Sequence, residues 1–213
     1  MKKLLSYIYP VTKKVVSEYN DILEITWYNG EKHLNSKNAN YSYGSLQKIL
    51  KIGLEKIDLT NSKEVLILGL GGGSVIETLR KDFNYQKNIT ALEIDPVIVQ
   101  IAKEEFNIRE SKNLKIICVD ALTYMQQNKR HFDLIILDLY IDIHVPSSFL
   151  KIPFWHSILK ASKKSILFNA SLEANTNDNI SNIISLLKEN KYHVEKLEKV
   201  NQTNTLVIAN IKN

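Results

Sequence analysis

The sequence predicts an α/β protein with a Rossmann-like, mostly parallel seven-stranded sheet, helices on both faces and a C-terminal antiparallel strand pair. Two observations lead to this prediction. From Glu64 onward, short apolar runs alternate with segments of helical periodicity, as in strand–helix–strand units. The last two apolar runs are joined by only a few residues, 201–204, and such a short link is typical of antiparallel neighbours.

A small N-terminal β-hairpin region precedes this sheet. Asp21–Tyr28 is rich in Ile, Leu, Thr, Trp and Tyr, and the following Asn-Gly pair is typical of a type I′ turn. Glu31–Asn35 would then be the returning strand. We therefore expect a hairpin region over residues 1–40 and a Rossmann-like domain over residues 41–213.

The other elements follow from periodicity. Short apolar runs predict strands, and apolar residues three and four positions apart predict helices. Pro96 fits the first turn of a helix that Asp95 would cap. The predicted strands of the sheet are 65–68, 89–92, 114–119, 132–137, 165–169, 193–200 and 205–211, and the predicted helices are 41–57, 74–81, 96–106, 121–128, 147–161 and 177–190.

The composition argues against several classes of protein. The 213 residues are 44% hydrophobic, which suffices for one domain with a core of its own. The net charge is +5, but the lysines are spread along the chain, so we expect no nucleic-acid partner. No run approaches the ~20 apolar residues of a membrane span, and we expect a cytoplasmic protein without membrane association. The single cysteine, Cys118, lies in an apolar run and is expected to be buried.

The residues that follow each strand are the candidate ligand-binding residues, because ligands of open α/β sheets bind beyond the carboxyl ends of the strands. After the first strand, residues 69–73 read Gly-Leu-Gly-Gly-Gly. Glycines allow sharp turns and a close approach by a ligand, and the next helix offers free N–H groups. Ser74 stands where the dinucleotide fingerprint G-x-G-x-x-G requires its last glycine, so the loop departs from that motif.

Acidic residues follow the next three strands. Asp95 already serves as the helix cap, so Glu93 is left over for a ligand. Its carboxylate can accept two hydrogen bonds from a ribose diol. Asp120 can accept from the exocyclic amine of adenine while the Ala121 amide donates to the ring, or it can simply cap the next helix. Asp138 can orient or deprotonate an amine or hold a cation, or it can be a loop acid bonded to backbone amides.

The histidines show no spacing typical of a metal site, and we expect no metal. His144 is the one that merits a test, because it lies close in sequence to Asp138 and Asp142. The chain contains neither a Gly-x-Ser-x-Gly elbow nor a P-loop lysine, which argues against hydrolases and NTPases.

Four segments, 68–73, 92–95, 119–121 and 133–138, resemble in order and spacing the spermidine synthase family, a branch of the class I methyltransferase fold. The resemblance covers roughly residues 11 to 170, including the hairpin region. It implies transfer of an aminopropyl group from decarboxylated S-adenosylmethionine to a small amine acceptor. It also implies a possible dimer through the hairpin region. By position, the implied cofactor-binding residues are Gly69, Gly71, Gly73, Glu93, Asp120 and Ala121, the implied catalytic residue is Asp138, and the implied substrate-binding residues are Tyr43, Tyr140 and Asp142.

The chain departs from the family at the reacting end. Ser74 stands where the family usually has an aspartate, residues 138–142 read Asp-Leu-Tyr-Ile-Asp rather than Asp-Ser-Ser-Asp-Pro, and residues 43–45 read Tyr-Gly-Ser rather than Tyr-Gln-Glu. The fifth strand also ends in 168–171 without the usual glutamine and glutamate. A polyamine is positively charged and needs acidic partners, and some of these partners are missing here. With Ser74 in place of the aspartate, the site also lacks a negative charge that would repel the carboxylate of intact S-adenosylmethionine. Two alternatives therefore stay open: a methyltransferase that uses intact S-adenosylmethionine on a small acceptor, and a non-catalytic nucleoside-binding protein.

Overall fold

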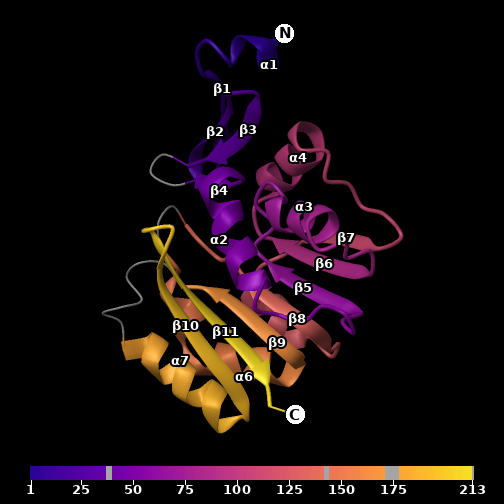
Figure 1. The fold of residues 1–213 in the computed structure, drawn as a ribbon, viewed down its shortest axis with the longest axis vertical. Helices are drawn as coiled ribbons and strands as arrows, with labels where there is room; N and C mark the ends of the chain where they lie inside the picture. Colours follow the sequence, from indigo (N-terminus) through magenta and orange to yellow (C-terminus); the bar gives the residue numbers. More distant parts are fainter. Residues whose placement is uncertain (37–39, 142–143, 171–177, 213) are drawn as a thin grey trace.

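A seven-stranded sheet forms the centre of the protein, and a smaller four-stranded sheet stands at its N-terminal end (Figure 1). The computed structural model describes residues 1–36, 40–141, 144–170 and 178–212. The central sheet has the order β10-β11-β9-β8-β5-β6-β7. Its strands are β5 (Glu64–Leu68), β6 (Asn88–Glu93), β7 (Leu114–Cys118), β8 (Phe132–Leu137), β9 (Ser162–Asn169), β10 (Tyr192–Val200) and β11 (Asn204–Ile211).

The five strands from β9 to β7 are parallel, and β11 is antiparallel to both β9 and β10. The chain places β6 and β7 on one side of β5 and then returns to place β8 on the other side. The order of the strands therefore reverses between β5 and β8, and ligands of open α/β sheets bind at the carboxyl ends of the strands at such a switch point. The predicted Rossmann-like sheet with its C-terminal antiparallel pair is confirmed.

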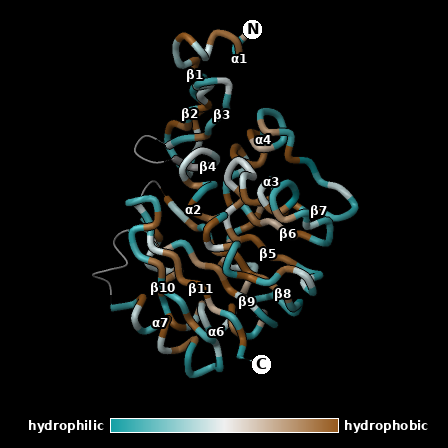
Figure 2. Tube along the Cα trace, in the orientation of Figure 1, coloured by the Kyte–Doolittle hydropathy of each residue, from teal (hydrophilic) through white to brown (hydrophobic). Residues whose placement is uncertain are grey.

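Helices cover both faces of the sheet, because the parallel strands are apolar on both sides. Every residue of β8 is buried, and Figure 2 shows hydrophobic colour along the central strands. One face packs against α2 (Gly44–Leu54), α3 (Ser74–Lys81) and α4 (Pro96–Glu105). The other packs against α5 (Ala121–Gln127), α6 (Ile152–Ala161) and α7 (Asp178–Glu189). In the described part of the chain, no helix has the length and apolar character needed to cross a membrane.

Three local predictions are corrected. The helix predicted over 41–57 begins at Gly44, because Asn40–Ser42 pairs with the N-terminal sheet as β4. The helix predicted over 147–161 is divided into a 3₁₀ turn, η1 (Ser147–Leu150), and α6. Lys151 between them is extended, since Pro153 cannot donate a helical hydrogen bond and fits only the first turn. Cys118 is exposed rather than buried, because β7 is the edge strand of the sheet.

The N-terminal sheet consists of β1 (Val11–Ser17), β2 (Asp21–Tyr28), β3 (Glu31–Asn35) and β4, in that order, and a short helix, α1 (Lys2–Leu5), precedes it. Asn29 and Gly30 have φ angles of 48° and 78°, as the predicted type I′ turn requires. The sheet extends to Ser42, slightly past the predicted boundary at residue 40.

Apolar packing and hydrogen bonds to the helix cap attach this sheet to α4, in addition to the ion pairs of Lys13 and Lys32 with Glu105. Its inner face packs Leu23 and Ile25 against Ile98 and Ile101 of the helix. The connection from β1 to β2 is held by Asp95, the N-cap of α4, whose Oδ2 accepts hydrogen bonds from the Ser17 hydroxyl and, at 2.8 Å, from the Asn20 side chain. Its Oδ1 accepts from the Val97 amide at 2.8 Å, which confirms the predicted cap.

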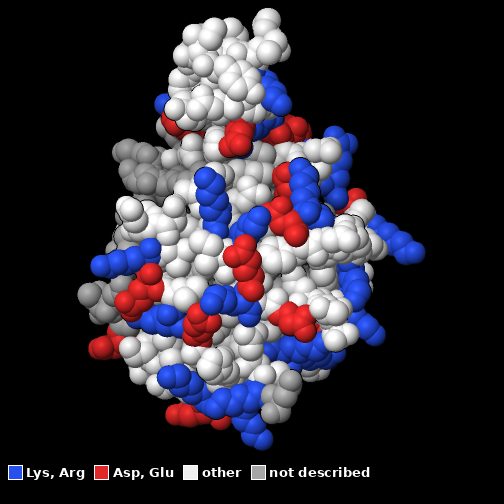
Figure 3. All heavy atoms as spheres, in the orientation of Figure 1, with Lys and Arg blue, Asp and Glu red and all other residues white. Residues whose placement is uncertain are grey.

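Most of the exposed large apolar side chains belong to residues 1–28, and this end of the molecule is largely white in the charge view of Figure 3. The outer face of the sheet includes Val16 and Ile22, which lie opposite each other on β1 and β2. Exposed apolar patches are typical of interaction sites. The expected homodimer stays a prediction.

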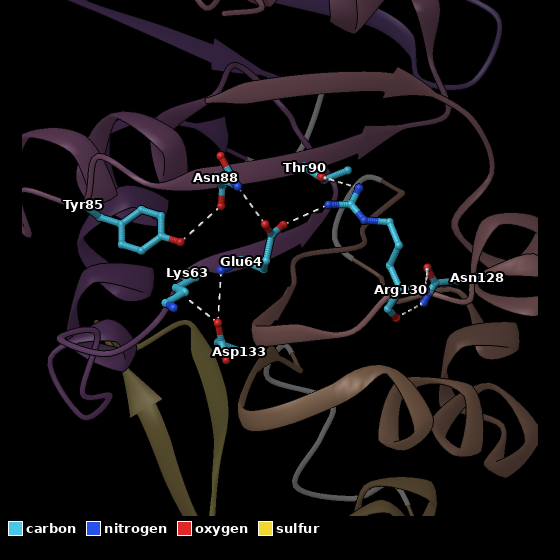
Figure 4. Close-up of polar contacts among 8 residues, drawn as sticks. All are labelled: Lys63, Glu64, Tyr85, Asn88, Thr90, Asn128, Arg130 and Asp133. Atoms are coloured by element: carbon cyan, nitrogen blue, oxygen red, sulfur yellow. Dashed lines mark hydrogen bonds and ion pairs between the residues drawn. The ribbon is translucent and has the colours of Figure 1, made fainter. Parts of the chain in front are cut away.

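A polar cluster joins the amino ends of β5, β6 and β8, at the edge opposite the glycine loop (Figure 4). Glu64 accepts hydrogen bonds from Arg130 at 2.9 Å and from the Asn88 side chain at 2.7 Å. Arg130 also donates to the Thr90 hydroxyl at 3.3 Å. The buried Asp133 accepts from the backbone amides of Lys63, at 2.7 Å, and Glu64, at 3.1 Å.

We predict that Asp133→Ala lowers the free energy of unfolding by about 1–3 kcal/mol, because it leaves two amides without their acceptor. Burial alone would raise the pKa of Asp133, but the two amides and the charges of Lys164 and Lys163 hold the pKa below its ordinary value. A lowered carboxyl pKa stabilises the fold above the unfolded-state pKa, and this stabilisation is lost as the pH falls through the folded-state pKa. Urea unfolding at pH 7 measures the loss. The exposed Glu55→Ala is the control, and equal effects of the two substitutions would contradict the prediction.

Candidate functional site

The strand register places three of the predicted site residues, Gly69, Glu93 and Asp138, in one row along the carboxyl edge of the sheet. Leu68 of β5 pairs with Leu92 of β6 on one side and with Leu137 of β8 on the other. Leu137 in turn pairs with Phe168 of β9. The residue after each of these is therefore a neighbour of the next, and the row across the switch point reads Glu93, Gly69, Asp138, Asn169.

The glycine loop is needed by the packing of the protein itself as well as by any ligand. Gly69, Gly71 and Gly73 have φ angles of 96°, 53° and 88°, which disfavour other residues. A Cβ at Gly69 would lie 2.1 Å from the carbonyl oxygen of Asp138, and one at Gly73 would lie 2.4 Å from the Ile108 side chain. We infer that Gly69 and Gly73 allow the loop to pack tightly at the start of α3.

Glu93 lies beneath the glycine loop, and its buried carboxylate accepts only from backbone amides in the described structure. Oε2 accepts from Gly71 at 3.2 Å, and Oε1 accepts from Ile94 at 3.0 Å and from Asp95 at 3.1 Å. Burial raises the pKa of Glu93 to about 7, although these hydrogen bonds oppose the change. A buried carboxylate with neutral partners can accept further hydrogen bonds, so the two oxygens of Glu93 fit the hydroxyl donors of a ribose diol.

Asp120 and Ala121 stand at the start of α5, beyond β7. Oδ1 of Asp120 accepts from the amides of Leu122, at 2.7 Å, and Thr123, at 3.3 Å. The capping role that the sequence left open is therefore present. Ala121 is buried in the core against α6, and its contact with adenine, like that of Asp120, stays a prediction.

Asp138 occupies the switch point itself. Its backbone amide donates to the carbonyl of Leu68 at 2.9 Å, which continues the pairing of β8 with β5. Its half-buried carboxylate accepts from Nδ2 of Asn169 at 2.9 Å. Burial raises the pKa of Asp138 to about 6, and the hydrogen bond from Asn169 works in the opposite direction. A carboxylate with such a pKa is mostly ionised at neutral pH and can still accept a proton.

The two predicted tyrosines contact different parts of the site: Tyr43 contacts the glycine loop, and Tyr140 contacts Asn169. Tyr43 precedes α2 with a φ of 70°, stacks on Phe106 at 4.6 Å and donates from its hydroxyl to the Gly72 carbonyl at 3.3 Å. Burial and the charge of Glu77 raise the pKa of Tyr43. Tyr140 follows Asp138, and its hydroxyl donates to the Asn169 carbonyl at 3.0 Å. Asp142 lies outside the described residues.

Sequence reasoning missed Asn169 as a functional residue. Asn169 is fully buried, and its Oδ1 accepts from Nδ2 of Asn204 at 2.8 Å. It stands at the carboxyl end of a buried apolar run, as Glu93 and Asp138 do, and this signal could have identified it. Asn204 gave no such signal, because it begins a strand instead of ending one.

The described residues contain no group of three or more His, Cys, Asp or Glu side chains that could hold a metal ion. The site is instead a row of carboxylates and amides around a glycine loop. Such a row can accept hydrogen bonds from hydroxyl and amino groups, and it can take up a proton at Asp138.

Comparisons with known proteins agree with this geometry. The sequence model of the spermine/spermidine synthase domain matches residues 47–205. A polyamine aminopropyltransferase of Vibrio vulnificus is 31% identical over 117 residues, which cover 54% of this chain and 38% of that protein. An eEF1A lysine and N-terminal methyltransferase homolog of Drosophila melanogaster is 32% identical over 80 residues, covering 36% of this chain and 12% of that protein. The chain thus spans less than half the length of these curated relatives, which are transferases.

Solved structures share the fold. A probable spermidine synthase from Corynebacterium glutamicum matches with a TM-score of 0.67 at 15% identity, covering 95% of this chain and 77% of that one. Human methyltransferase-like protein 13 in complex with SAH matches with a TM-score of 0.63 at 19% identity, covering 80% of this chain and 83% of that one. The domain match extends over most of the chain. It includes β5, β6, β8 and β9, whose carboxyl ends form the row. The chain belongs to the spermine/spermidine synthase family.

Proposed function

We propose that the protein is a transferase that binds decarboxylated S-adenosylmethionine and transfers its aminopropyl group to a small amine acceptor. The observation that carries the proposal is the row across the switch point. It places a buried carboxylate, Glu93, under the glycine loop and a second carboxylate, Asp138, beside that loop, directly after β8. Membership of the family supports the same reaction class.

Glu93 and the glycine loop would hold the nucleoside part of the donor. The Gly71 amide fixes one oxygen of Glu93, and the amides of Ile94 and Asp95 fix the other. The carboxylate is therefore held in place before a ligand arrives, which lowers the entropic cost of binding a ribose diol. When bound, an S-adenosyl donor supplies an electrophilic carbon attached to a positively charged sulfur.

Asp138 would act on the acceptor. In the proposed step a C–N bond would form as the C–S bond of the donor breaks and methylthioadenosine leaves. The amine must also lose a proton, and an ionised carboxylate with a pKa of about 6 can take it up near neutral pH. Tyr140 follows on the same loop, with its hydroxyl bonded to the Asn169 carbonyl. We place the amine between these two side chains and the donor.

Methyl transfer from intact S-adenosylmethionine is the second candidate, and Ser74 favours it. Ser74 is buried at the start of α3, and its amide donates to the Ser42 hydroxyl at 3.3 Å. Ser74 stands where the family usually has an aspartate. Because both serines are neutral, they neither attract the amine of the decarboxylated donor nor repel the carboxylate of the intact one. Calorimetric titration with both donors distinguishes the candidates by the preferred ligand. Binding of neither donor, nor of methylthioadenosine, would reject the nucleoside site.

We predict that Glu93→Ala weakens the binding of the preferred donor by about 1.5–3 kcal/mol, the range for a hydrogen bond to a charged group. Calorimetry with the wild type and the variant measures the difference. Glu93→Gln retains the size of the side chain and controls for collapse of the loop, and the exposed Glu55→Ala should bind as the wild type does. An unchanged dissociation constant in Glu93→Ala would exclude Glu93 as the ribose ligand.

We also predict that the affinity for methylthioadenosine falls as the pH decreases below about 7. Ribose hydroxyls donate to the ionised form of Glu93, whose pKa is about 7 in the free protein, so binding must displace a proton at lower pH. The loss approaches about tenfold per pH unit, and the affinity levels off above pH 8. Titrations in buffers of different ionisation enthalpy detect the released proton. The profile should persist in Asp138→Asn and disappear in Glu93→Gln, and a flat wild-type profile would contradict the assignment.

For the transfer step, we predict that Asp138→Asn lowers kcat by about 10²–10⁴-fold, the usual contribution of a general base, and leaves donor binding unchanged. The amide retains an oxygen that can accept the hydrogen bond from Asn169, so the loop should keep its structure. Quantification of the released nucleoside, which is methylthioadenosine for aminopropyl transfer and S-adenosylhomocysteine for methyl transfer, together with calorimetry of the donor, measures both effects. Retained turnover would rule out Asp138 as the base. Donor binding without turnover in the wild type would favour the non-catalytic alternative.

A further inference from the structure

The end of the C-terminal strand pair reaches the reacting carboxylate through two asparagines. Asn169 is the last residue of β9 and donates from Nδ2 to Oδ1 of Asp138 at 2.9 Å. Asn204 is the first residue of β11 and donates from Nδ2 to Oδ1 of Asn169 at 2.8 Å. The backbone of the two strands is joined at the same point, where the Ala170 amide donates to the Thr205 carbonyl at 2.8 Å.

The chemistry of the three groups determines the direction of this chain. An ionised carboxylate can only accept hydrogen bonds, so the NH₂ group of Asn169 must face Asp138. The amide oxygen of Asn169 then faces Asn204, which must present its own NH₂ group. The backbone of Asn169 is also held in place, because the residue is fully buried and its main-chain carbonyl accepts from the Tyr140 hydroxyl at 3.0 Å.

We propose that Asn169 is a positioning residue that orients Asp138 for the transfer reaction, and that Asn204 fixes Asn169 in the orientation that donates to the carboxylate. The proposal rests on the proposed function of Asp138. It gives the antiparallel strand β11 a part in the reaction beyond closing the sheet, because β11 supplies the residue that keeps the donor group of Asn169 turned toward the site.

The surroundings of Asp138 make this donor important. Burial favours the neutral form of the carboxyl group, and the hydrogen bond from Asn169 is the interaction that favours the ionised form. The neighbouring titratable groups on the same loop are Tyr140, bonded to the Asn169 carbonyl, and His144, whose backbone pairs with Ile141. Without the donor from Asn169, Asp138 would hold its proton to a higher pH, so a smaller fraction of the protein at neutral pH would carry the ionised carboxylate that can take up a proton from an amine.

Strands β9 and β11 also offer a matched control. Asn210 lies on β11 opposite Ser165 of β9, and its Oδ1 accepts from the Ser165 hydroxyl at 2.7 Å. This is also a side-chain hydrogen bond between the same two strands, but it lies toward the amino end of β9, away from Asp138. Asn210→Ala therefore removes a comparable structural contact without touching the proposed chain.

The test follows the side-chain carboxyl carbon of Asp138 by NMR between pH 4 and 9 in the full-length protein. We expect Asn169→Leu to raise the pKa of Asp138 by about one pH unit, Asn204→Ala to raise it by a smaller amount, and Asn210→Ala to leave it unchanged. In each variant, the acidic limb of the pH profile of kcat should move to higher pH by the same amount as the pKa of Asp138. An unchanged Asp138 titration in both Asn169→Leu and Asn204→Ala, or an equal change in Asn210→Ala, would overturn the proposal.

This measurement keeps the two proposals separate, because the titration needs neither donor nor turnover. If the titration shifts as expected but Asp138→Asn retains activity, the positioning contact exists and the proposed function of Asp138 fails. If Asp138→Asn is inactive and the titration does not move, Asp138 is the base and Asn169 does not position it. If Asn169→Leu does not fold, Asn204→Ala, at the partly exposed start of β11, decides the question.

Discussion

The close approach of Gly69 to the carbonyl oxygen of Asp138 is the constraint on which the site depends. A side chain at residue 69 would collide with that oxygen, so β5 and β8 can lie side by side at their carboxyl ends only because a glycine stands there. The parallel register then brings Glu93 and Asn169 into the same row. The row at the switch point is thus a consequence of backbone packing, and its polar side chains occupy positions which that packing determines.

The site retains polar groups in surroundings that disfavour charge. Glu93 is buried with only backbone amides to stabilise its ionised form, and its pKa rises accordingly. Such an arrangement costs the free protein stability, because a buried carboxylate without a cation is poorly solvated. A ligand that donates further hydrogen bonds would relieve this cost, and proteins commonly accept local instability where a ligand binds.

Elements from both ends of the chain meet at this edge. Asp95 connects Ser17 and Asn20 of the N-terminal region to the turn that carries Glu93. Asn204 connects the C-terminal strand pair to Asp138 through Asn169. The central parallel strands supply the row, whereas the additions at either end hold its two carboxylates in place.

Local signals in the sequence determined the fold class, the type I′ turn at Asn29 and Gly30, the cap at Asp95 and the positions of Glu93 and Asp138 after their strands. These features depend on neighbours within a few residues, which is why periodicity and turn chemistry reveal them. Only the tertiary structure decided that Cys118 is exposed, that Gly69 serves strand packing, and that Asn204 reaches Asp138 through Asn169. Each of these depends on which strands are neighbours and which strand lies at the edge, and that order arises from long-range packing that no local pattern encodes.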